Sequence, residues 1–350
     1  MNSLVSGFTI LFMFWTITHL ARRIVTRNGE VLAGDNIVMV LGAGAIGALS
    51  YAYTDTFWFS AVEGEVYAMS SMFTALVVWL MFKWEENADS PTSMRWIILI
   101  AYLMGLSIGV HILNLLTIPA LVMIYFFRRY KYNPEKPMWH YGLMIVAALA
   151  VSMLILGVIN GIIIPYTVLM GAYVDTFAVN TLGLPVNVGM IIFVFAIFGL
   201  LGWLIYFSHK RCLRIVNVVA LCCTVLLLGF SSYAMMTVRA NANPPMNSNN
   251  PSNPHMLLSV LNRDQYGDRP LFYGPYYSAM PLAMTSQNGD ILSDDEYIPT
   301  GEYVSKSMMW LNPATQQYEE REVFDGYKYS DEANRLFPRM WFYSRRSSYE

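Results

Sequence analysis

The residues best suited to chemistry lie in one short segment between two apolar runs. Residues 54–65 carry Asp55, Glu63 and Glu65 but no Lys or Arg to pair with them. A carboxylate at a membrane surface is costly unless it is solvated or has a function. One interpretation is a short interfacial helix that presents these acids to an active site, with Trp58 and Tyr67 available for substrate contact.

Structural roles remain open for the same residues. In the simpler interpretation the acids are solvated loop residues, and Trp58 anchors the segment at the membrane interface, where aromatic side chains gather. Glu65 precedes an apolar run, so it also suits the first turn of a helix, where a negative charge favours the helix dipole.

Three further polar residues are candidates. His111 and Asn114 are three residues apart, which places both on one helix face; they could contact a phosphate or sugar, or hydrogen-bond between helices. Asp175 lies in Tyr173-Val-Asp-Thr-Phe177, which repeats Tyr53-Thr-Asp-Thr-Phe57 with one free position. Chance similarity is the better explanation of this repeat, yet Asp175 still adds another acid to the predicted outer face. A lone His with no second His or Cys at ligand spacing predicts no metal site.

The basic residues predict how the chain crosses a membrane. Every Lys and Arg up to Arg214 lies in one of four clusters separated by long apolar runs, and the alternate loops contain none. Cytoplasmic loops carry the excess of positive charge in membrane proteins, so the clusters predict one cytoplasmic face. They are Arg22/Arg23/Arg27, Lys83/Arg95, Arg128/Arg129/Lys131/Lys136 and Lys210/Arg211/Arg214.

The apolar runs predict eight spans, each near the length of about 20 residues that crosses a hydrocarbon core. The stretch 96–127 is too long for one crossing, and Gly105, Gly109 and Pro119 interrupt it, so we divide it in two. Residues 54–65, the turn at His111, residues 164–187 and the tail from 239 then share the outer face. The predicted spans are 4–21, 36–53, 66–84, 96–110, 113–127, 139–163, 188–207 and 213–236.

Composition agrees with this class of protein. The chain is 55% hydrophobic and 13% charged, against roughly 25% charged in soluble domains. Its net charge of −2 does not suggest nucleic acid. Cys212, Cys222 and Cys223 show neither a disulfide framework nor metal-ligand spacing. We expect an all-α polytopic membrane protein, with a transmembrane domain at 1–238, a Pro/Asn-rich linker at 239–256 and an extracytoplasmic segment of mixed α/β or irregular structure at 257–350.

Three runs of sequence resemble a known family. They are Asp55-Thr-Phe-Trp-Phe-Ser-Ala-Val-Glu-Gly-Glu65-Val-Tyr-Ala, Gly105-Leu-Ser-Ile-Gly-Val-His111-Ile-Leu-Asn114-Leu-Leu-Thr-Ile-Pro119 and Leu261-Asn-Arg-Asp-Gln-Tyr-Gly-Asp-Arg-Pro270-Leu-Phe-Tyr-Gly274. The chain resembles a bacterial polytopic family once catalogued only as a domain of unknown function. It is similar to the transmembrane protein O-mannosyltransferases of the GT-C superfamily.

The resemblance implies an enzyme that moves a sugar from a polyprenyl-phosphate carrier to a protein or glycan acceptor at the outer face of a bacterial cytoplasmic membrane. In that superfamily an acid in the first outer loop takes the proton of the acceptor hydroxyl, for which it must lie within hydrogen-bond reach. Many members need no metal, so we expect no cofactor. Asp55, Glu63 and Glu65 are then supporting acids, while Trp58, Tyr67, His111, Asn114 and Asp175 are candidates for substrate binding.

The chain departs from the family pattern at its beginning. The family's first helix, and the loop with Asp-x-x-Glu and His-Pro-Pro-Gly, have no counterpart here, so the principal base is missing. We therefore expect a fragment at both ends that is inactive alone. The alternative is a non-catalytic membrane scaffold or a transporter subunit. Mid-span polar residues are few and uncharged, Asn160 and Asn217, which disfavours ion-coupled transport.

Overall fold

The computed structural model describes residues 1–28, 31–130, 133–266, 270, 272–277, 279 and 303–338. The chain divides into two compact units, Met1–Thr167 with Ile192–Ala242 and Val168–Ile191 with Asn243–Glu350, and each is described by itself. The helices are α1 Asn2–Val25, α2 Asp35–Ala52, α3 Asp55–Val62, α4 Tyr67–Glu86, α5 Met94–Ile108, η2 Ile112–Thr117, α6 Ile118–Arg129, α7 Met138–Val158, η3 Ile159–Ile163, α8 Ile164–Asn180, α9 Val188–Lys210, α10 Arg214–Phe230, α11 Met235–Asn241 and α12 Pro254–Asn262.

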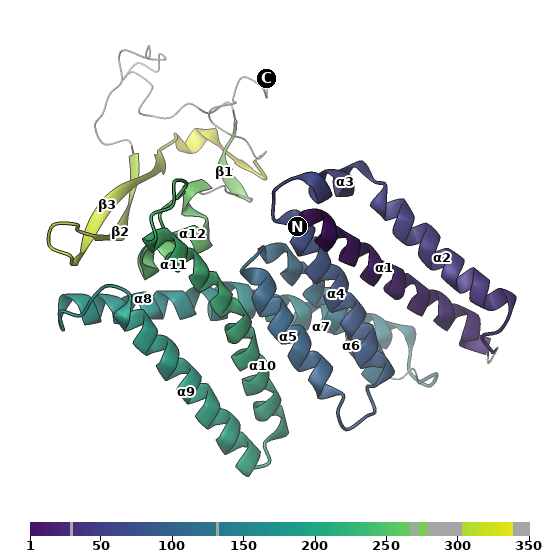
Figure 1. Cartoon of the computed structure of the whole chain (residues 1–350). Helices are drawn as coiled ribbons and strands as arrows, with labels where there is room; N and C mark the ends of the chain where they lie inside the picture. Colours follow the sequence, from purple (N-terminus) through teal and green to yellow (C-terminus); the bar gives the residue numbers. More distant parts are fainter. Residues whose placement is uncertain are drawn as a thin grey trace. The chain divides into compact units, whose positions relative to one another are not determined.

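Helices dominate, and most of them suit a membrane (Figure 1). Among the described residues, 7 helices are long and apolar enough to cross a bilayer, and the shorter α5 corresponds to the predicted span 96–110. The protein is a multi-pass membrane protein of mostly helical structure, as predicted. The reason is that lipid offers no hydrogen-bond partner, so a spanning backbone must satisfy its own polar groups, as a helix does.

The division of residues 96–127 into two helices is confirmed. Helix α5 ends at Ile108, the short 3-10 helix η2 follows, and α6 begins at Ile118 with Pro119 in its first turn. Proline suits that position because the first helical N–H groups have no intrahelical acceptor. The chain therefore reverses beside His111.

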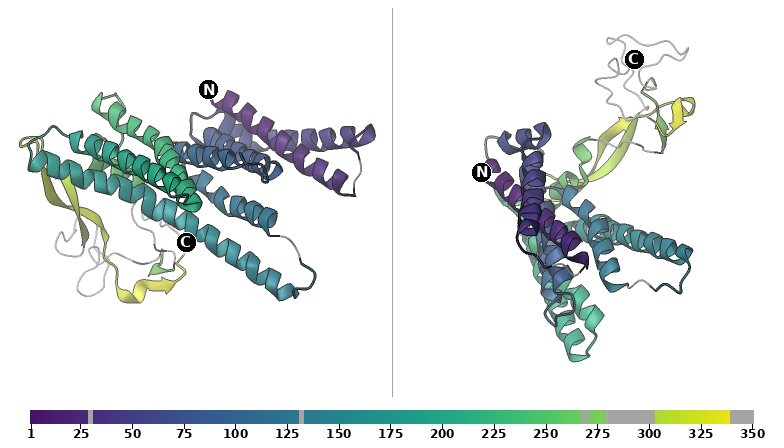
Figure 2. Two further views of the ribbon diagram at one scale, coloured as in Figure 1. Left: turned by 90° about the horizontal axis from the view of Figure 1, so that it is seen from below. Right: turned by 90° about the vertical axis from the view of Figure 1, so that its right-hand side faces the viewer.

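In the first unit, α1 packs against both α2 and α4 (Figure 2, purple to blue). Glycines allow the α1–α2 approach, since a Cβ on Gly44 would lie 2.4 Å from Thr18 Cγ2. The closest approach joins α5 to α10. A Cβ on Gly105 would lie 2.0 Å from the Leu226 carbonyl oxygen, and one on Gly229 would lie 2.4 Å from that of Tyr102. Small residues let membrane helices pack backbone to backbone in this way.

The predicted outer loop at 164–187 is wrong over most of its length. The helix that begins at Met138 passes through a π-helical turn at Ile159–Ile163 and continues as α8 to Asn180. The residues buried along α8 recur at helical spacing: Ile164, Val168, Ala172, Asp175 and Ala178. The sequence pattern did not indicate this buried helix face because it contains Asp175. A carboxylate suggests an exposed loop residue as long as its buried hydrogen-bond donors are unknown.

The second unit combines helix and strand, as predicted for the C-terminal segment. Two antiparallel pairs are formed, β1 with β4 and β2 with β3. The predicted linker contains the end of α11 and the start of α12, where the Asn253 side chain accepts a hydrogen bond from the Met256 N–H at 3.0 Å. The strands are β1 Tyr273–Pro275, β2 Tyr303–Leu311, β3 Tyr318–Tyr327 and β4 Asn334–Leu336.

Gly105→Ala tests the backbone contact between α5 and α10. We expect the free energy of unfolding to fall by about 1–3 kcal/mol, the usual cost of overpacking, because the new methyl group meets a carbonyl oxygen. Thermal unfolding of the purified protein in detergent measures the change. Gly142→Ala in α7 is the matched control, since its Cβ would meet nothing within 4 Å; equal destabilisation by the two substitutions would contradict the proposed contact.

Candidate functional site

An open cavity of about 790 Å³ lies at the end of the first unit where α1 begins. Its volume falls within the roughly 300–1,000 Å³ typical of small-molecule pockets. Three of the predicted site residues line it: Asp55, Glu63 and Tyr67. The rest of the lining is polar or aromatic and includes Tyr51, Thr54 and Ser71.

Helix α3 positions the acid at one side of the cavity. The predicted interfacial helix is present as Asp55–Val62, and Asp55 occupies its first turn, where a carboxylate favours the helix dipole. Phe57 is 6% exposed and packs on Tyr51, with ring centroids 4.6 Å apart. Trp58 points the other way, 57% exposed. One ring therefore fixes α3 to the bundle while another is free to enter the membrane interface.

The beginning of α1 fixes the segment that carries Glu63. The Asn2 side chain donates to the carbonyl oxygens of Glu63 and Glu65, the latter at 2.9 Å, and the Ser3 hydroxyl donates to Ala61 O at 3.1 Å. These bonds use backbone acceptors, so the Glu63 carboxylate stays available to the cavity. Figure 1 shows α3 beside the N-terminus of α1.

Tyr67 links the cavity to the turn at His111. The two rings lie 5.6 Å apart between centroids, and His111 Nδ1 accepts a hydrogen bond from the Leu113 N–H at 3.1 Å. The hydrogen bond from Leu113 orients the imidazole. His111 is thus next to the cavity but is not part of its lining.

Asn114 has an interhelical role. It is 1% exposed, and its Oδ1 accepts a hydrogen bond from the Thr74 hydroxyl of α4 at 3.2 Å. This is the structural alternative raised by the sequence, and Asn114 lies outside the cavity lining. Glu65 and Trp58 are exposed and also lie outside the lining. A substrate role for these three residues stays a prediction.

Asp175 belongs to the second unit and is fully buried, at 0% exposure. Its carboxylate accepts hydrogen bonds from the Asn187 N–H at 3.1 Å, the Met190 N–H at 3.3 Å and the Tyr318 hydroxyl at 2.8 Å. A Cβ on Gly189 would lie 2.4 Å from the Asp175 Cα, so that position suits glycine. Asp175 thus joins α8 to α9 and to β3, and a role in substrate binding stays a prediction.

The same unit contains a second contact that sequence reasoning missed. His255 Nε2 lies 2.7 Å from the Thr176 hydroxyl, and its ring contacts Tyr318 edge-on at 5.0 Å. The Asn180 side chain also forms a pair of 2.8 Å hydrogen bonds with the backbone of Tyr318. No sequence spacing could reveal these contacts, because they join residues more than 60 positions apart.

The cavity is acidic. Within the part of the chain that the structure describes, its lining includes the carboxylates of Asp55 and Glu63 and no Lys or Arg. Such a lining can accept hydrogen bonds from hydroxyl groups and can take a proton from one of them. It opposes the binding of a phosphate, since like charges at close range repel.

Sequence reasoning missed other lining residues as well. Ser71 follows Tyr67 by four residues, so helix spacing could have identified it as a neighbour on the same face. Asn2 is not in the lining but holds the segment that carries Glu63. It could not be found from spacing, because this contact crosses about 60 positions of sequence and depends on the packing of α1 against α4.

Comparison with known families supports the resemblance. Residues 1–134 match the family described as protein O-mannosyl-transferase TMEM260 N-terminal domain. The N-terminal part of the chain is similar to that domain, as predicted. Residues 267–350 match a family of unknown function. This agrees with the predicted resemblance to a family once catalogued only as a domain of unknown function. No curated protein and no solved structure matches the chain. The matched N-terminal part contains the whole acidic cavity.

Tyr318→Phe tests the hydrogen bonds around Asp175. Burial and the neighbouring Asp175 raise the pKa of Tyr318, so its hydroxyl stays protonated and donates. Removing this donor leaves a buried carboxylate short of a partner, and we expect a loss of about 1–3 kcal/mol in the stability of the second unit. Chemical denaturation followed by tryptophan fluorescence and proteolysis checks this. Tyr273→Phe, 58% exposed, is the control; an equal effect would contradict the role of the hydroxyl.

His255 predicts a pH dependence of the second unit. Burial lowers the pKa of His255 from 6.5, against the opposing charge of Asp175. The unfolded chain therefore binds a proton more readily than the folded one, and stability falls as pH drops below about 6.5. We expect His255→Gln to reduce the loss of thermal stability between neutral and mildly acidic pH. His209→Gln, at the exposed end of α9, should leave the wild-type pH profile unchanged.

Proposed function

We propose that the chain forms the membrane core of a GT-C-type glycosyltransferase, which moves a sugar from a polyprenyl-phosphate carrier to a hydroxyl group of a protein or glycan at the outer membrane face. The observation that carries this proposal is the coincidence of the acidic cavity with the residues matched to the O-mannosyltransferase domain. The localisation in a bacterial cytoplasmic membrane is part of the proposal and rests on the family resemblance, while the proposed orientation rests on the distribution of basic residues.

The chemistry of the cavity suits the acceptor side of the reaction. A hydroxyl nucleophile needs a hydrogen-bond acceptor that orients it and receives its proton. Asp55 and Glu63 are exposed to the cavity, and Tyr67 and Phe59 offer aromatic surfaces for a sugar or peptide. Aromatic rings with a polar edge combine apolar contact with hydrogen bonding. Asp55 and Glu63 are proposed as supporting acids that orient the acceptor hydroxyl.

The donor needs a different environment. Its phosphate would be repelled by the two carboxylates, so its charge must be compensated by groups outside the described lining. Its hydrocarbon tail suits the apolar helix surfaces that border the cavity in the bilayer. The loop between α8 and α9 belongs to the same unit as the C-terminal part of the chain. We therefore infer that the loop and the C-terminal part lie on the same membrane face. That face is the outer one if the cluster Lys210/Arg211/Arg214 is cytoplasmic.

Asp55→Asn and Glu63→Gln test the proposal. In membranes that contain the full protein, labelled polyprenyl-phosphate mannose is supplied with a Ser/Thr-containing acceptor peptide, and transfer to the peptide is measured. We expect each substitution to reduce the rate at least tenfold, yet by less than the roughly 10²–10⁴-fold contribution of a general base. The reason is that each acid supports the acceptor hydroxyl without being the principal base.

Asp35→Asn is the matched control, because Asp35 is also a first-turn acid and is exposed at the opposite end of α2. Transfer that is equal in wild type and in both cavity variants would exclude the cavity as the acceptor site. A wild-type protein that binds neither donor nor acceptor and transfers no sugar would favour the scaffold alternative.

A further inference from the structure

A second cavity lies at the opposite end of α1, among the basic residues. It has a volume of about 280 Å³ and is lined by residues of α1, α2 and α4, among them Trp15, His19, Arg22, Trp79, Lys83 and Glu86. Helix α1 has 24 residues, so at 1.5 Å per residue about 36 Å separates the two ends of the helix. The second cavity is therefore independent of the acidic one and of the proposed transfer reaction.

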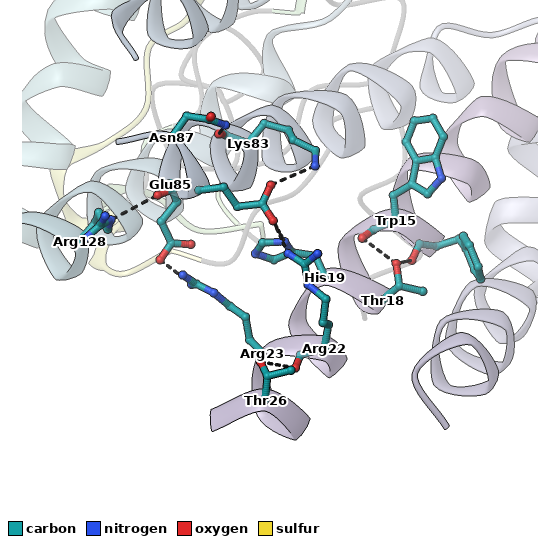
Figure 3. Close-up of polar contacts among 12 residues, drawn as sticks. Trp15, Thr18, His19, Arg22, Arg23, Thr26, Lys83, Glu85, Asn87 and Arg128 are labelled. Atoms are coloured by element: carbon teal, nitrogen blue, oxygen red, sulfur yellow. Dashed lines mark hydrogen bonds and ion pairs between the residues drawn. The ribbon is translucent and has the colours of Figure 1, made fainter. Parts of the chain in front are cut away.

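Ion pairs surround this cavity with an excess of positive charge. The Glu86 carboxylate pairs with Arg22, with Lys83 Nζ at 3.0 Å and with His19 Nδ1 at 3.2 Å. Figure 3 shows Arg22, His19 and Lys83 converging beside the end of α4. One carboxylate thus faces two permanent cations, while the neighbouring Glu85 is already paired with Arg23 at 2.5 Å. The cavity can take up one more anion without a net negative charge.

His19 has an unused nitrogen at this position. The residue is 8% exposed, and its Nε2 is buried with no hydrogen-bond partner among the described residues. A buried polar atom without a partner is unfavourable, so this nitrogen favours a ligand that supplies a hydrogen bond. Because Nδ1 faces a carboxylate, it carries the proton; Nε2 can then accept from a hydroxyl group of a headgroup, or donate to a phosphate oxygen when the ring is protonated.

Aromatic rings continue from the cavity along α1. Trp15 and Trp79 lie 5.0 Å apart between centroids, Phe12 and Trp79 5.7 Å, and Phe8 and Phe12 6.5 Å. Trp15 and Phe8 are 37% and 44% exposed. The row extends away from the charged end of the helix and toward its middle. It provides an apolar surface for a hydrocarbon chain whose polar end is at Arg22 and Lys83.

We propose that this cavity binds the phosphate headgroup of an anionic phospholipid, with Arg22 and Lys83 contacting the phosphate and one acyl chain lying along the aromatic row. Cations at the cytoplasmic ends of helices are expected from the charge distribution alone. That expectation does not explain a cavity, a buried unpartnered nitrogen and an adjoining aromatic surface at one place. The volume of about 280 Å³ is just below the roughly 300–1,000 Å³ range of small-molecule pockets, which suits a headgroup and excludes a whole lipid.

The proposal is tested in nanodiscs that contain the full protein. Brominated phosphatidylglycerol or brominated phosphatidylcholine is added at the same fraction of a phosphatidylcholine bilayer, and quenching of tryptophan fluorescence is measured. We expect phosphatidylglycerol to quench more strongly, because the bromine on its chain lies beside Trp15 and Trp79. The Trp15→Phe/Trp79→Phe variant should lose this difference, since it removes the tryptophans next to the site.

Variants that remove charge provide a second test of the lipid-binding proposal. Arg22→Gln/Lys83→Gln should weaken phosphatidylglycerol binding about fivefold for each cation removed. Arg27→Gln/Arg95→Gln removes the same charge from the same end of the bundle but leaves the cavity lining intact, and it should retain the preference. Arg22→Lys keeps the charge and should also retain it, which separates loss of charge from loss of folding.

Three results would overturn the proposal. They are equal quenching by the two lipids, an equal loss in the cavity and control charge variants, and full displacement of the lipid by excess inorganic phosphate. The last result would show that the cavity recognises phosphate without the lipid chain. Each outcome leaves the sugar-transfer assay unaffected, so failure of this proposal is distinguishable from failure of the proposed function.

Discussion

Helix α1 is held against α4 at both ends, and the placement of both cavities depends on this. At one end Asn2 donates to the carbonyl groups of Glu63 and Glu65, and at the other Arg22 and Arg23 pair with Glu86 and Glu85. The two helices therefore run in the same direction, and α2 packs against α1 and runs back the opposite way. At the first end the hydrogen bonds use backbone carbonyl groups, so among the described residues the carboxylates there remain unpaired and that end of the bundle is acidic. At the other end the contacts are ion pairs made by basic residues, so that end is basic.

This polarity bears on the proposed reaction. At the acidic end the carboxylates have no basic partner in the described lining, so they are available to a hydroxyl group. At the basic end Glu85 and Glu86 of α4 are paired with cations of α1 or of α4 itself: Glu85 with Arg23, and Glu86 with Arg22 and Lys83. The two proposed roles, binding of a neutral acceptor at one end and of an anionic lipid at the other, are compatible with this separation of charge.

The repeated pentapeptide shows how much depends on packing. Tyr53-Thr-Asp-Thr-Phe57 and Tyr173-Val-Asp-Thr-Phe177 share four residues, yet Asp55 is exposed at a helix start and Asp175 is 0% exposed inside a helix. The difference arises from partners remote in sequence. The Tyr318 hydroxyl and the N–H groups of Asn187 and Met190 compensate the Asp175 carboxylate, and no comparable donors approach Asp55 within the described residues.

The sequence by itself determined the membrane class and the division of residues 96–127 into two helices, and it allowed a short helix within residues 54–65. Hydropathy, chain length and helix-breaking residues are local properties on which insertion into a bilayer depends directly. It could also place Asp55, Glu63 and Tyr67 near one another, since they lie within one short segment. Only the tertiary structure decided that α8 continues through Asp175, that Asn114 bonds to Thr74, that Asn2 holds the segment carrying Glu63, and that His19 lines a second cavity. Those outcomes depend on hydrogen-bond partners contributed by distant helices, and the spacing of residues along a chain does not contain that information.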